Sequence, residues 1–140
     1  MTAQGKIAQG EIRKSILIGA SPERVWAYLT EAELLAKWFH PAREDLAQGK
    51  DFALLADDGS VLCWGKIIEA RPPFHLKMTF TARPMNGLMT TVTFSLAREG
   101  QGTRLDLLHQ GLHGADDPFG LTLAFDTGWD QHFVTLRKTI

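Results

Sequence analysis

The chain has 140 residues, of which 44% are hydrophobic and 22% charged, enough apolar material for one globular core. Its formal net charge is −1, from 15 basic and 16 acidic side chains spread along the sequence. This balance argues against a nucleic-acid binder and against a membrane-surface protein, since both classes usually carry a basic face. The apolar runs, such as residues 16–18, are far below the roughly 20 residues that cross a bilayer.

The N-terminus and the cysteine content indicate where the protein works. Residues 1–10 are polar and lack the apolar stretch of a signal peptide, so we expect a flexible lead-in there. Residues 11–140 then form a single domain. The one cysteine, Cys63, excludes an internal disulfide and suits a reducing compartment, so a cytoplasmic protein is expected.

The first elements in the chain are a strand and two short helices. Residues 11–18 alternate as a strand, with isoleucines on one face. A helix over 22–30 follows, because Ser21 can accept hydrogen bonds from free backbone N–H groups at its start. A second helix over 31–39 ends before Pro41, since the residue before a proline is pushed away from helical geometry.

Five strands are expected next, separated by turn-forming sequences. Residues 57–60 and 99–102 carry the Asp, Gly and Ser residues that are typical of hairpin turns. Apolar and polar side chains alternate throughout, which indicates antiparallel strands with one covered face and one wet face. The expected strands cover residues 51–56, 61–70, 74–82, 89–97 and 103–110.

A long helix closes the chain. Asp117 and Pro118 fit its cap and its first helical residue. Gly120 and Gly128 each weaken it by roughly 1 kcal/mol relative to alanine, so the helix starts either there or as late as Leu123. Its apolar stripe recurs at steps of four, four and three residues: Phe125, Trp129, Phe133 and Leu136.

The element order predicts an α+β architecture: one strand, two short helices, five strands and a long helix. The apolar stripe of the long helix and the inner faces of the strands each need a cover. They can cover each other, with the two short helices at one end of the sheet.

The order of several short motifs resembles the helix-grip superfamily of START-like lipid-transfer, polyketide cyclase and birch-pollen-allergen-like (SRPBCC) proteins. The nearer resemblance is to its branch of activator of heat-shock-protein ATPase homologues. The resemblance covers about residues 11–140, and one departure lies in the turn at 48–50, which lacks a Gly-Gly pair often found there. The matching segments are ASPERVW at 20–26, KWF-x-P at 37–41, GKIIE-x-x-PP at 65–73, T-x-VTF at 90–94, GTRL at 102–105, H-x-GL at 109–112 and GW at 128–129.

The resemblance implies a curved antiparallel sheet of about six strands wrapped around the C-terminal helix, with a cavity between them. Plain core packing is the alternative for any one of the apolar side chains concerned. Small-molecule pockets are concave and mostly apolar, with a few polar groups. The residues expected to line the cavity are Trp38, Phe52, Trp64, Met78, Phe80, Phe94, His109, Phe125, Trp129 and Phe133.

Polar side chains give few signs of catalysis. His109 lies on the expected inner face, where it serves either as a ligand contact or acid–base group, or as a neutral, hydrogen-bonded core residue. His40 lies either at the cavity mouth or in solvent. No catalytic triad, phosphate loop or metal-ligand spacing stands out, so we predict no metal and no cofactor.

Three functions fit this sequence. The leading one is binding or carrying a small hydrophobic molecule. The second is a cyclase- or hydrolase-type enzyme that uses His109 as acid or base in the same cavity. The third is contact with a chaperone, or a stress-response role, through the outer surface. Nucleic acid and membrane insertion are not expected, and a homodimer is possible because symmetric pairs are the commonest oligomers.

Overall fold

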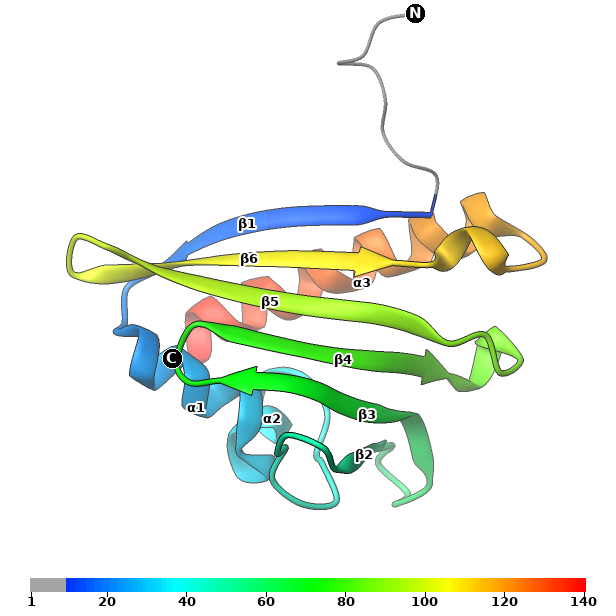
Figure 1. Cartoon of the computed structure of the whole chain (residues 1–140), viewed down its shortest axis with the longest axis horizontal. Coiled ribbons are helices and arrows are strands. Elements are labelled where there is room, and N and C mark those ends of the chain that lie inside the picture. The colour runs from blue at the N-terminus through cyan, green and yellow to red at the C-terminus, as the bar shows by residue number, and fades with distance from the viewer. Residues whose placement is uncertain (1–9) are drawn as a thin grey trace, which may run out of the picture.

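The computed structural model describes residues 10–140, so the predicted lead-in, except for Gly10, lies outside the described residues. The element order is strand, two short helices, five strands and a long helix, as expected (Figure 1). The elements are β1 (Ile12–Ile18), α1 (Pro22–Thr30), α2 (Ala32–Trp38), β2 (Asp51–Leu55), β3 (Val61–Arg71), β4 (His75–Ala82), η2 (Arg83–Met85), β5 (Thr90–Glu99), β6 (Gly102–Gln110), η3 (Leu112–Gly114) and α3 (Pro118–Thr139).

The six strands form one antiparallel sheet in the order β1-β6-β5-β4-β3-β2. In Figure 1, α3 crosses behind this sheet, and α1 and α2 lie together at the end where α3 finishes. The predicted α+β helix-grip architecture is therefore confirmed.

Both caps that the sequence predicts are present. The Ser21 hydroxyl accepts a hydrogen bond from the backbone N–H of Arg24 at 3.2 Å and starts α1. The Asp117 carboxylate accepts one from the backbone N–H of Gly120 at 3.1 Å and starts α3. Helix α3 therefore begins at Pro118 and not at Leu123, because the cap and the proline outweigh the weak helix propensity of the glycines.

The hydrophobic core lies between the inner face of the sheet and the C-terminal half of α3. Trp129, Phe133 and Leu136 are the buried residues of α3, and they follow the predicted stripe. The last strand, β6, buries Leu105, Leu107 and His109 on its inner face, also as predicted. The first half of α3 buries much less of its surface, and this difference creates the candidate site.

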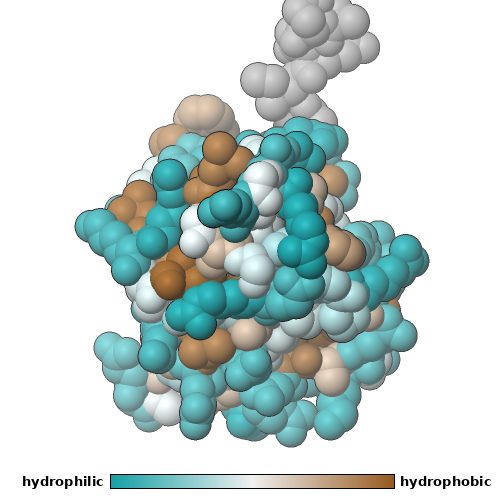
Figure 2. Space-filling model, turned by 90° about the vertical axis from the view of Figure 1, so that its left-hand side faces the viewer, coloured by the Kyte–Doolittle hydropathy of each residue, from teal (hydrophilic) through white to brown (hydrophobic). Residues whose placement is uncertain are grey.

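The outer surface mixes apolar and polar side chains. Figure 2 views the molecule from the end where α1 lies, and its hydrophobic areas are small and separated by hydrophilic ones. Among the described residues, no helix is both long and apolar enough to cross a membrane.

Candidate functional site

A cavity of about 820 Å³ lies under the first half of α3. We call it the α3 cavity. It is bounded by α3 from Gly120 to His132, by the segment after β4 (residues 84–88), by the segment before α3 (residues 114–117) and by Phe39 and His40. The segments 84–88 and 114–117 lie toward the end of the sheet opposite α1 (Figure 1). Its volume falls within the range of about 300–1,000 Å³ that is typical of small-molecule sites.

Small residues on α3 leave this space open. Gly120, Ala124 and Gly128 all line the cavity and recur at steps of four residues, so they lie on one side of the helix. A Cβ atom built on Gly128 would meet no atom within 4 Å. The helix therefore presents a groove where larger residues would fill the space with side chains.

Aromatic rings form much of the cavity wall. The Phe80 ring on β4 and the Phe125 ring on α3 meet edge-to-face with centroids 6.0 Å apart. Trp129 stacks on Phe39 with centroids 5.3 Å apart, and both rings reach the cavity. Such walls suit an apolar or aromatic ligand.

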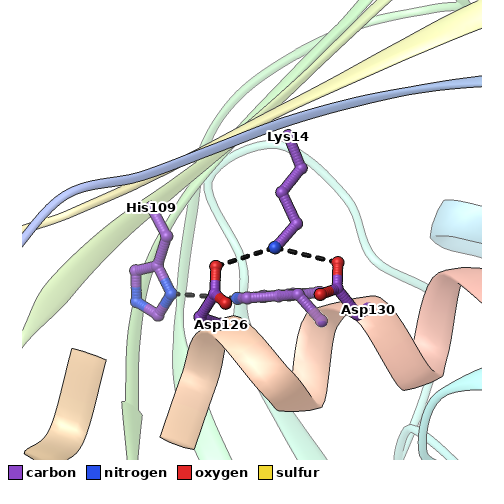
Figure 3. Close-up of polar contacts among 5 residues, drawn as sticks. Lys14, His109, Asp126 and Asp130 are labelled. Carbon is purple, nitrogen blue, oxygen red and sulfur yellow. Dashed lines mark hydrogen bonds and ion pairs between the residues drawn. The ribbon is translucent and has the colours of Figure 1, made fainter. Parts of the chain in front are cut away.

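Behind the wall, His109 is completely buried and hydrogen-bonded at both ring nitrogens. The Trp129 indole N–H donates to His109 Nδ1 at 3.1 Å, a contact drawn in Figure 3. Because an indole N–H can only donate, Nδ1 must be the unprotonated nitrogen. Nε2 therefore carries the proton and donates to the Thr90 hydroxyl at 2.9 Å, which in turn donates to the Phe80 carbonyl at 2.7 Å.

This chain of hydrogen bonds fixes His109 as a neutral residue. Burial away from water lowers its pKa to about 4. Neither ring nitrogen is free to take a proton from a ligand, so the geometry corresponds to the hydrogen-bonded core histidine that the sequence left open.

An ion cluster ties the middle of α3 to the sheet (Figure 3). Lys14 Nζ on β1 lies 2.8 Å from a carboxylate oxygen of Asp126 and 2.8 Å from one of Asp130. Burial acts to lower the pKa of Lys14, but the hydrogen bonds and charges of the two aspartates outweigh it, so the pKa is raised. Lys14 therefore remains charged and anchors α3 next to the cavity.

Two histidines lie together at the Phe39 end of the α3 cavity. The rings of His40 and His132 are 5.3 Å apart between centroids and nearly perpendicular. His132 Nδ1 lies 3.2 Å from the Trp38 carbonyl oxygen. Burial lowers the pKa of both histidines, and the neighbouring His132 lowers the pKa of His40 further.

Cys63 on β3 also reaches the cavity, but it offers no nucleophile. Burial raises the pKa of its thiol to about 12, so the thiol stays protonated near neutral pH. Within residues 10–140, no three His, Cys, Asp or Glu side chains are grouped so that they could hold a metal ion.

The ten residues predicted to line a cavity fall into three groups. Phe80, Phe125 and Trp129 line the α3 cavity. The second group consists of five buried residues that pack in the core and enclose no space large enough for a ligand: Trp38, Phe52, Met78, Phe94 and Phe133. His109 is likewise a buried core residue that does not line the cavity. Trp64, the third case, does not lie in the core.

Trp64 is on the outer face of the sheet, where its side chain is 37% exposed. Neighbouring residues of a strand point to opposite faces, and here Cys63 points inward and Trp64 outward, so the prediction that Trp64 lines the cavity is wrong. Lys66 shares the face of Trp64 and is exposed. Because Lys66 is charged and lies two residues from Trp64, the sequence itself indicates that this face of the strand is exposed to solvent.

The cavity also brings together residues that the sequence pattern does not predict. His132, Leu121 and the segment 84–88 all line it. His132 follows Trp129 by three residues and so lies near the same helix face, which is a usable signal. The segment 84–88 joins two strands, and its position over the cavity depends on tertiary folding.

Comparisons with known proteins support one family. The family model described as "Activator of Hsp90 ATPase homolog 1-like protein" matches residues 19–140. None of the curated proteins matches the chain. Among solved structures, protein MLL2253 from Mesorhizobium loti is 27% identical, with a TM-score of 0.79 over 91% of this chain and 94% of that one.

Two further structures share the fold at lower identity. The Aha1 dimer from Colwellia psychrerythraea is 21% identical, with a TM-score of 0.75 over 91% of this chain and 92% of that one. PFC0360w, titled an HSP90 activator from Plasmodium falciparum, is 21% identical, with a TM-score of 0.72 over 91% of each chain.

Proposed function

This chain belongs to the family of activator of Hsp90 ATPase homolog 1-like proteins, and from that premise we propose that it binds a small hydrophobic molecule in the α3 cavity. The observation that carries the proposal is the cavity itself, about 820 Å³ with walls that include Phe80, Phe125 and Trp129. An aromatic wall of this kind binds apolar ligands by removing their surface from water.

The proposal assigns binding and not catalysis. An acid–base reaction at His109 finds no support, because both of its ring nitrogens are already hydrogen-bonded. The Cys63 thiol is protonated near neutral pH, which gives no support to a covalent intermediate either.

A neutral fluorescent dye, 1-aminoanthracene, tests the proposal. We expect saturable binding with enhanced fluorescence, and weaker binding by at least about tenfold for Gly128→Trp, since an indole at this position enters the open space beside Gly128. Thr127→Trp is the matched control, because Thr127 is exposed on the same helix and does not line the cavity. Equal dye binding by both variants would contradict the assignment to this cavity.

A second candidate function is contact with a chaperone of the Hsp90 type. It is favoured by the family description and by exposed apolar side chains on the outer face, where Trp64 is 37% and Met89 46% exposed. The test is the ATPase rate of Hsp90 from the same source. An increase on adding this protein, reduced by Trp64→Ser and unaffected by Gly128→Trp, would support it, and no increase would eliminate it.

A further inference from the structure

The charged groups that line the α3 cavity restrict what kind of ligand head it can hold. Among the described lining residues there is no lysine or arginine, and His40 and His132 are the two that can become cationic. The acidic lining residues, Asp116 and Asp117, lie before the start of α3. His132 is 15 residues beyond Asp117, so at 1.5 Å per residue the two ends are roughly 20 Å apart along the helix.

His132 presents one free ring nitrogen. A carbonyl oxygen only accepts hydrogen bonds, so the 3.2 Å contact with the Trp38 carbonyl places the proton on His132 Nδ1. The neutral ring then carries its lone pair on Nε2. Nε2 has no hydrogen-bond partner within residues 10–140, and it is not among the buried polar atoms left without one, so it remains accessible.

His40 completes the pair. Its side chain makes no hydrogen bond within the described part of the chain, and its ring centroid is 5.3 Å from that of His132. A proton is unfavourable on either ring, because burial opposes a charge at both, and the neighbouring imidazole opposes it further at His40. An anion placed beside the two rings would offset this penalty.

Of the titratable groups around the cavity, His40 and His132 are the ones that can take up a proton when a ligand binds. Asp57 acts from the β2–β3 turn and raises the pKa of His40 somewhat. The Cys63 thiol is protonated, because burial raises its pKa more than Arg83 of η2 lowers it. The acidic residues that line the cavity are Asp116 and Asp117, at its far end.

We infer that the ligand of the α3 cavity is a hydrophobic carboxylic acid, with its carboxylate beside the paired rings of His40 and His132 and its apolar body along Phe125 and Trp129. The inference rests on the proposed binding function. A permanently charged sulfate or phosphate ester would need a permanent cation, which the lining residues do not provide. A weak acid needs one proton, shared between its carboxylate and an imidazole, so the ionised ligand takes up one proton as it binds.

Proton uptake gives the binding a defined pH dependence. Above pH 6.5, both the carboxylate and the free histidines lack the proton that the complex holds, so binding weakens by up to tenfold per pH unit. We therefore expect the dissociation constant of an acid to rise at least about tenfold between pH 6.0 and pH 8.0. The amide of the same molecule carries no charge, and its affinity should not change.

Pyrenebutyric acid and pyrenebutyramide are the probes, titrated by fluorescence at pH 6.0, 7.0 and 8.0. The test variant combines His40→Gln with His132→Asn, since asparagine keeps an N–H for the Trp38 carbonyl and removes Nε2. His113→Asn is the matched control, because His113 is exposed and does not line the cavity. Melting curves check that each variant is folded, and calorimetry in two buffers of different ionisation enthalpy measures proton uptake.

The expected result is uptake of about one proton by the acid and none by the amide, with the pH dependence lost in the double variant alone. Acid and amide that bind equally at every pH would overturn the inference and leave the binding function intact. If neither probe nor 1-aminoanthracene binds, the proposed function itself is refuted. Should the double variant not fold, the acid–amide comparison in the unmodified protein decides the question.

Discussion

At the scale of single residues, His109 shows how a buried polar side chain is accommodated beside a cavity. Its two ring nitrogens form hydrogen bonds with Trp129 and Thr90, so neither is left without a partner in the core. Its ring also meets the Phe125 ring edge-to-face at 5.0 Å between centroids. His109 therefore orients Trp129 and Phe125, two residues of the cavity wall, and its contribution to binding is indirect.

Protonation of His109 should destabilise the fold in acid. Its pKa is about 4 in the folded protein, against an ordinary value of 6.5 in the unfolded chain, so the unfolded state takes up the proton first. The stabilisation is complete above pH 6.5 and is lost as the pH falls toward 4, by about 3 kcal/mol in total. Urea unfolding at intervals from pH 7 to pH 4 measures it.

A His109→Gln variant provides the comparison for that measurement. Carboxyl groups titrate in the same pH range, and they do so in the unmodified protein and in the variant alike. The variant should be less stable at pH 7 but lose less stability on acidification. Parallel stability curves for the two proteins would show that His109 is not the group responsible.

At the scale of elements, α3 combines two halves with different tasks. The C-terminal half is anchored by Trp129, Phe133 and Leu136, and the Lys14 cluster holds the helix to β1 at its middle. The N-terminal half lies over the cavity, and its outward-facing Phe119 and Leu123 are 77% and 54% exposed. Few buried contacts hold this half, so local opening there requires less free energy than opening at the C-terminal half.

Two glycines of α3 should respond differently to alanine. Gly128→Ala should raise the free energy of unfolding by about 0.5–1 kcal/mol, since a Cβ there meets open space and alanine favours the helix. At Gly120 a Cβ would lie 2.1 Å from the Asp117 carboxylate and would displace the helix cap. That loss offsets the gain in propensity, so Gly120→Ala should be the less stable variant by about 1 kcal/mol. Equal melting temperatures for the two variants would contradict this account of the helix start.

At the scale of the whole molecule, the fold could be predicted because local signals agree with one another. Alternation gives the strands, Ser21 and Asp117 give the helix starts, and the order of elements gives the layers. The side of each strand is harder to predict, because alternation separates two faces without saying which one is covered. Trp64 is expected at the cavity as one of the aromatic residues, whereas the charge of Lys66 marks the face that they share as the exposed one.

The α3 cavity was harder to predict than the fold. A cavity depends on the absence of large side chains, and in the sequence Gly120 and Gly128 indicate only weak helix propensity, while Ala124 gives no signal at all. Its other walls come from the segments 84–88 and 114–117, which meet through tertiary folding alone. Most of the predicted aromatic set therefore lies in the core next to the cavity, and a smaller part lies on its wall.

The most direct test of a hydrophobic ligand in the α3 cavity is native mass spectrometry of the protein purified from its own host. Gly128→Trp and Thr127→Trp are purified in parallel, and any bound molecule is extracted and identified. We expect a stoichiometric small apolar molecule on the unmodified protein and on Thr127→Trp, and its loss from Gly128→Trp. A molecule that Gly128→Trp retains at full occupancy would contradict the account.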